Sequence, residues 1–183
     1  EFLEDPKSKE GGGSGKVIAI VLGVVVLGGL CFVAMVAAIA IPNLIEARKN
    51  GNESGAIGSL KTISAAQALF REGDKDEDGV LDYGTLGELS TAGSYGGLVD
   101  SVLGSGVKYG YVFNASPSTT TCEFLWFATA SPSKPGTTGD RYFATNHEGV
   151  TYFSVTSPIP MNTDDCTLPQ DRLQPGDISP IGR

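Results

Sequence analysis

The sequence predicts an α+β protein in which a long N-terminal apolar helix packs on a four-stranded antiparallel sheet. Three observations lead to this fold class. The segment Val17–Ile41 contains no charged side chain. Apolar residues then recur every three or four positions as far as Phe70, which is helical spacing. Further along the chain they alternate with polar residues, which is strand spacing.

The first element is the apolar segment Val17–Ile41, which follows a polar, glycine-containing stretch (residues 1–16) that we expect to be a flexible tail. As a helix it would extend roughly 37 Å, enough to cross a bilayer core of about 30 Å. A cleaved secretory signal is the main alternative, but the apolar cores of such signals are only about 7–15 residues long. The segment therefore predicts a membrane anchor for an exported domain.

The helix is expected to continue to residue 72, with changes in character along its length. Pro42 removes a backbone donor and predicts a kink. Several glycines predict that the helix is partly melted near residues 51–58. Beyond Pro42 a single apolar stripe is expected to face a core, and Gly73 ends the helix. The stripe consists of Ala56, Leu60, Ile63, Ala66 and Phe70.

Residues 73–166 are expected to form a globular head. Four strands in series with short connections indicate an antiparallel sheet, and one face of this sheet would cover the apolar stripe of the helix. The strands are expected around residues 109–113, 123–128, 141–145 and 150–154. The following segment, residues 167–183, contains several prolines, which predict an extended tail without regular structure.

The sharpest chemical signal is an acidic stretch that reads D-x-D-x-D-G-x-x-D. Alternate carboxylates supply the oxygen ligands that Ca²⁺ prefers, and Gly79 permits a sharp turn. The expected ligands are Asp74, Asp76, Asp78, the Val80 carbonyl and Asp82. The twelfth position holds Thr85 in place of the usual bidentate Glu, so Glu88 is a candidate replacement. The alternative is a solvated acidic turn without an ion.

Small residues lower the steric profile of the apolar helix. Such residues let helices approach one another closely, which a side facing lipid does not need. The alternative is the ordinary composition of a membrane span. The candidate assembly positions, together with the expected kink, are Gly23, Gly28, Gly29, Ala34, Ala38 and Pro42.

Composition and charge argue against several function classes. The net charge is −8, and the stretch from Glu72 to Glu88 carries −6 of it, whereas nucleic-acid binding rewards clusters of Lys and Arg. His147 is the single histidine and falls in a predicted hairpin turn, which leaves no imidazole network for catalysis or for a histidine-based metal centre. We therefore predict neither an enzyme nor a small-molecule substrate.

The stretch Ala37-Ala38-Ile39-Ala40-Ile41-Pro42-Asn43-Leu44-Ile45-Glu46-Ala47-Arg48 resembles the second half of a type IV pilin N-terminal helix. In that family an apolar span is followed by further helix, an αβ-loop, a four-stranded sheet and a cysteine-closed loop. The likeness extends over about Val17–Cys166, and only the AIAIPN stretch is specific. Two features depart from the pattern. Val25 stands where pilins carry a Glu, and a polar stretch precedes the helix.

The resemblance implies a disulfide between Cys122 and Cys166, which in pilins pins the C-terminal loop to the sheet. Both cysteines would lie on the exported side, where disulfides persist. Two free thiols are the alternative. Cys31 is expected to be a small apolar residue among helices.

The resemblance also implies a function, which is that of a structural subunit of a type IV pilus-like extracellular filament. Its partners would be identical subunits in a helical homopolymer, with the inner membrane as the location before assembly and the cell surface afterwards. Two alternatives remain open. One is a pseudopilin of a type II secretion system, and the other is a monomeric membrane-anchored binding domain with a pilin-like fold.

Overall fold

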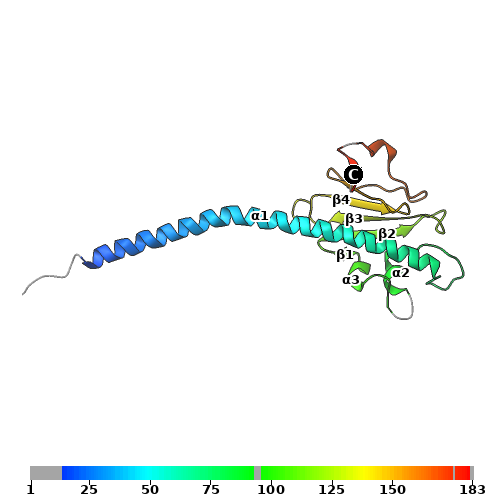
Figure 1. Ribbon diagram of the computed structural model, residues 1–183, viewed down its shortest axis with the longest axis horizontal. Coiled ribbons are helices and arrows are strands. Elements are labelled where there is room, and N and C mark those ends of the chain that lie inside the picture. The colour runs from blue at the N-terminus through cyan, green and yellow to red at the C-terminus, as the bar shows by residue number, and fades with distance from the viewer. Residues whose placement is uncertain (1–13, 93–95, 175, 182–183) are drawn as a thin grey trace, which may run out of the picture. The chain divides into compact units, whose positions relative to one another are not determined.

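The computed structural model describes residues 14–92, 96–174 and 176–181 of the chain (Figure 1). The chain divides into two compact units, Glu1–Leu44 and Ile45–Arg183. Helix α1 (Ser14–Glu72) supplies the described part of the first unit and continues into the second. The second unit, which we call the head, contains all other elements.

The predicted apolar helix is confirmed, and α1 includes the whole of Val17–Ile41. It is the one helix in the described part of the chain that is long and apolar enough to cross a membrane, with a mean hydropathy of 3.0 in its most apolar stretch. None of that stretch is buried. Large apolar side chains there are exposed to between 49% and 68%, so the structure leaves this surface without any cover.

The prediction of a partly melted helix near residues 51–58 is wrong, because α1 is continuous through this segment and through Pro42. The cause is packing of this part of α1 against the rest of the head, which overrides the weak helix propensity of glycine. Gly55 lies against the ring of Tyr109, where an added Cβ would come within 2.7 Å of the ring. Here glycine allows close contact and does not loosen the helix.

The head contains a six-stranded antiparallel sheet whose strands follow one another in chain order. The strands are β1 (Val107–Lys108), β2 (Tyr111–Pro117), β3 (Trp126–Pro132), β4 (Tyr142–Asn146), β5 (Thr151–Ser154) and β6 (Ile178–Pro180). The α+β class is confirmed, but the predicted number of four strands is wrong. The four expected strands correspond to β2–β5, and two very short edge strands complete the sheet. Three short helical segments are α2 (Leu86–Thr91), α3 (Ser101–Gly104) and the 3-10 turn η1 (Gln170–Arg172).

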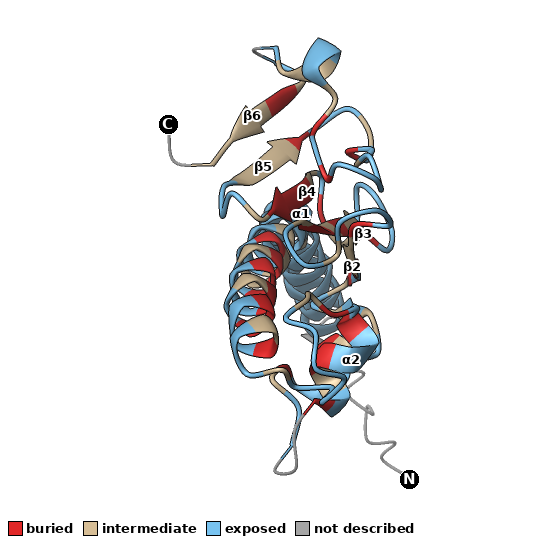
Figure 2. Ribbon diagram, turned by 90° about the vertical axis from the view of Figure 1, so that its right-hand side faces the viewer, coloured by how far each residue is buried: buried red, intermediate tan, exposed pale blue. Residues whose placement is uncertain are grey.

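The predicted helical stripe is confirmed as the centre of the main core. All five of its residues are at most 2% exposed. They pack with the side chains that alternate strand residues direct toward the helix, including Phe113, Trp126 and Phe143. Figure 2 shows the buried residues of α1 along one side of the helix within the head.

The opposite face of the sheet is covered by the C-terminal segment, so the prediction of a wholly extended tail is wrong. A second apolar cluster forms there from Ala144, Ile159, Leu168 and Ile178. Arg172 stabilises this arrangement by donating from Nε and Nη2 to the carboxylate of Asp177, at 2.9 and 2.7 Å. These bonds hold the pKa of Asp177 well below its usual range, at about 2. Pro169 lies directly before η1, and Pro180 is the last residue of β6.

A buried carboxylate joins α1 to the loop between β3 and β4. Glu53 has a side chain only 4% exposed, and its Oε2 accepts from Nε of Arg141 at 2.6 Å. Its Oε1 accepts from the backbone amides of Asp140 and Arg141, at 2.8 and 3.2 Å. Beside it, Asn52 Nδ2 donates to the Thr138 carbonyl oxygen at 2.8 Å, and Lys49 Nζ pairs with Asp140 Oδ2 at 2.6 Å. We call these contacts the Glu53 clamp.

Candidate functional site

The acidic loop begins directly where α1 ends. The amides of Gly73 and Lys75 donate to the carbonyl oxygens of Leu69 and Phe70, both at 3.2 Å, which closes the last turn of the helix. The backbone then turns sharply, with positive φ at Asp74, Glu77 and Gly79. Gly79 tolerates this conformation without strain, as the sequence pattern predicted. The loop therefore folds back on itself over a few residues.

This turn brings three carboxylates together. One oxygen each from Asp74, Asp76 and Asp78 lies within 4.8 Å of the others. Hydrogen bonds from the loop backbone orient two of these side chains, because the Gly79 amide donates to Asp74 Oδ2 at 3.2 Å and the Val80 amide donates to Asp78 Oδ1 at 2.8 Å. The backbone thus holds three negative groups at a spacing suited to a shared cation.

The environment of the cluster fits a hard cation in two respects. Asp74 Oδ1 is buried and has no hydrogen-bond partner among the described residues, and an unsatisfied buried oxygen is costly. The pKa of the Asp76 carboxyl is raised, first by burial and then by the neighbouring charges of Asp78, Asp82 and Asp74. Both features are relieved by a divalent ion bound among the carboxylates.

Two of the predicted ligands are engaged elsewhere. Asp82 lies outside the carboxylate cluster, and burial raises the pKa of the Asp82 carboxyl, an effect that the thiol of Cys122 opposes. The Val80 carbonyl oxygen accepts from the Asp82 amide at 3.2 Å. Glu88, the candidate replacement at the end of the loop, instead caps α2, where its Oε2 accepts from the Thr85 amide at 2.7 Å. Of the predicted side-chain ligands, the structure brings Asp74, Asp76 and Asp78 together.

A buried glutamine holds the end of the loop against the helix. Gln67 is fully buried, and its amide makes two bonds to the backbone of Gly84, donating from Nε2 at 2.6 Å and accepting at Oε1 at 3.0 Å. Our sequence reasoning missed this residue. The signal was present, because Gln67 lies four residues after Ile63 and so on the apolar side of the helix, where a polar residue needs a partner.

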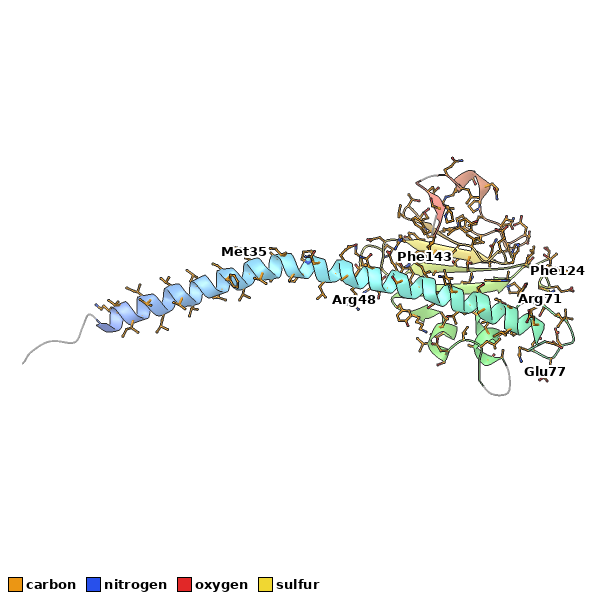
Figure 3. The ribbon with its side chains drawn as sticks, viewed as in Figure 1. Met35, Arg48, Arg71, Glu77, Phe124 and Phe143 are labelled. Carbon is orange, nitrogen blue, oxygen red and sulfur yellow. The ribbon has the colours of Figure 1, made fainter. Side chains whose placement is uncertain are left out.

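Arg71 fixes the loop from the other side. Its Nε donates to the carbonyl oxygen of Glu123 at 2.7 Å, and its guanidinium lies over the rings of Tyr83 and Phe124 at 5.7 and 6.0 Å. Figure 3 shows Arg71 and Phe124 close together at the end of α1, with Glu77 on the loop beyond them. The acidic loop is thus anchored at both ends to the rigid core.

The predicted disulfide is absent, since Cys122 and Cys166 are both free thiols in the described part of the chain. Burial and the nearby charge of Asp82 raise the pKa of the Cys122 thiol, and Cys166 is fully buried. Hydrogen bonds take the place of the expected bridge. The Thr119 amide donates to the Thr163 carbonyl oxygen at 3.0 Å, and the Ser118 hydroxyl donates to that of Asp164. These bonds attach the C-terminal segment to the turn before β3.

The candidate assembly positions all lie on the uncovered part of α1. Gly23, Gly28 and Gly29 have nothing within 4 Å of where a Cβ would stand, and the side chains of Ala34 and Ala38 are exposed. This is the geometry that close approach of another helix requires. The structure leaves the positions available and does not itself supply a partner.

Comparison of the chain with protein-family models, with curated proteins and with solved structures finds no match. The architecture, a long N-terminal apolar helix followed by an antiparallel sheet, is compatible with a pilin-like protein.

Proposed function

We propose that this protein is the structural subunit of a type IV pilus-like extracellular filament. The observation that carries the proposal is the uncovered apolar surface of α1 between Val17 and Ile41, in a chain whose head has a core of its own. A soluble monomer does not tolerate such a surface in water. Burial of each Val, Leu or Ile side chain contributes about 1.5–3 kcal/mol, so bundling of these helices drives assembly.

The membrane and the filament are successive environments for the same helix in this proposal. Before assembly the apolar segment lies in the inner membrane, and afterwards it lies in the filament core among identical helices. The heads form the outer shell. The absence of charge from Val17 to Ile41 suits both environments, because a charged group is costly in either.

Electron microscopy of material sheared from cells tests the proposal. We expect filaments of constant width in which mass spectrometry finds this chain as the main component. A protein that stays monomeric in detergent-free membranes, with no surface filaments, overturns the proposal. That result favours the monomeric membrane-anchored binding domain. Filaments confined to the cell envelope favour a pseudopilin of a type II secretion system.

We also propose that Ca²⁺ binds Asp74, Asp76 and Asp78 and orders the acidic loop. The proposal is supported by the spacing of the three carboxylates and by the unpartnered Asp74 Oδ1. The ion's role in this proposal is structural, because the loop that it orders connects α1 to the rest of the head.

Calcium is expected to stabilise the head measurably. A ligand at about 100 times its Kd stabilises a protein by about 2.7 kcal/mol, so the full chain in detergent should unfold at a higher temperature in Ca²⁺ than in EDTA. The fluorescence of Trp126, the only tryptophan, reports unfolding. The double variant Asp76→Asn, Asp78→Asn should lose this difference. Glu77→Gln, a matched control in the same loop, should keep it, and equal shifts in both variants contradict the site.

A further inference from the structure

A hollow of about 330 Å³ opens beside α1 at the β6 edge of the sheet. Its apolar lining comes from Ile57 on the helix, from Val150 before β5, and from Pro180 and Ile181 at the end of β6. The exposed side chain of Lys61 also lines it, and Lys61 has no ion-pair partner among the described residues. We call this feature the Lys61 groove. Gly149 and Thr151 complete the lining, so the groove combines apolar side chains with polar groups and a single positive charge.

The acidic loop presents the complementary features. Leu81 is 50% exposed and Val80 is 40% exposed, so two consecutive large apolar side chains reach the surface of the loop. Exposed acids stand close to them in the loop, and Glu77 is the one outside the D-x-D-x-D pattern of the cation site. Its carboxylate therefore remains available when an ion is bound. We call residues 77–81 the loop tip, an apolar projection with a negative group.

One copy of the chain cannot bring the two features together. Lys61 lies eleven residues before the end of α1, roughly 17 Å along the helix axis, and the loop is anchored at that end by Gln67 and Arg71. Complementary surfaces at separate places on one molecule make head-to-tail contacts, and such contacts generate open helical arrays when the rotation does not close a ring.

We infer that the loop tip of one head docks in the Lys61 groove of a second copy, with Leu81 against Ile57 and Val150 and with Glu77 facing Lys61. This inference rests on the proposed function, for which it supplies the contact between heads. Such a contact is too small to hold two soluble proteins together by itself. The apolar helices supply the affinity, and the charge pair fixes the register of neighbouring heads.

Charge exchange in the full chain tests the contact in cells. Lys61→Glu should lower filament yield by about tenfold or more, because like charges then face each other at every repeat, and Glu77→Lys should do the same. The double variant Lys61→Glu, Glu77→Lys should restore most of the yield. Lys134→Glu and Asp171→Lys, matched exchanges at exposed sites outside the contact, should assemble normally.

A zero-length carbodiimide cross-link between the Lys61 amine and the Glu77 carboxylate of different copies provides a second readout. It is sought by mass spectrometry in sheared filaments and in membranes, so that the contact is tested even where filaments fail to form. Wild-type filament yield from Lys61→Glu overturns the docking and leaves the filament proposal standing. If the cross-link is found in neither preparation, the docking is also overturned. If the cross-link forms but the cells make no filaments, only the filament proposal is overturned.

Discussion

Replacing Val25 by Glu should lower filament yield by about 30-fold or more. The segment Val17–Ile41 contains no charged residue that could pair with the new carboxylate. An acidic side chain near the middle of a membrane-embedded helix costs about 2.5–3.5 kcal/mol, and the same group in a filament core is unpaired in every subunit. The yield is measured by electron microscopy and immunoblotting of sheared material, with the membrane fraction followed in parallel.

Val25→Leu is the matched control, because it keeps the apolar character and should assemble like the wild type. The experiment also separates this protein from the type IV pilins that its sequence resembles, in which a Glu at this place supports assembly. Equal or higher yield from Val25→Glu would show that the core does hold a partner for a carboxylate. The charge-free core that we propose would then be wrong.

Replacing Glu53 by Ala should destabilise the head by about 3 kcal/mol. The change removes the carboxylate from the Glu53 clamp and leaves Arg141 and two backbone amides without their acceptor. Loss of one partner from a buried charge pair is costly for this reason, although the 36% exposure of Arg141 moderates the effect. Urea unfolding of the full chain in detergent, followed by the fluorescence of Trp126, measures the change.

The control lies on the same helix. Glu46 pairs with Lys49 at 3.0 Å, but its side chain is 58% exposed. Glu46→Ala should therefore cost less than about 1 kcal/mol. Similar losses from the two variants would mean that burial of Glu53 does not determine its contribution.

The sequence predicted those parts of the fold whose signal is periodic. The stripe from Ala56 to Phe70 has helical spacing over several turns, and β2–β5 are long enough to alternate. Strands β1 and β6 have only two and three residues, and β6 ends in proline, so neither carries a pattern. Gly55 misled us for another reason. Its weak helix propensity is a local property, whereas its contact with Tyr109 joins residues far apart in the sequence.

The candidate site was predictable to a similar degree. The D-x-D-x-D-G pattern located Asp74, Asp76 and Asp78, because alternate residues of a tight turn face one point. Asp82, the remaining carboxylate of the pattern, lies outside this cluster, and the linear spacing does not show where the backbone turns away. Glu88 caps α2, and the sequence carries the capping-box spacing Thr85-x-x-Glu88 that indicates this role. The family resemblance suggested a disulfide where this chain uses hydrogen bonds.

The continuity of α1 has a mechanical consequence. The helix runs without a break from its apolar segment into the core of the head, so a pulling force on that segment is transmitted to the head through one continuous helix. The Glu53 clamp is the first set of polar contacts between α1 and the loop that joins β3 to β4. The clamp's hydrogen bonds and ion pairs therefore bear this force together with the buried apolar stripe from Ala56 to Phe70, which follows them along α1. Single-molecule stretching should therefore locate the weakest point of a strained subunit at Lys49, Asn52 and Glu53, ahead of any disruption of β2–β5.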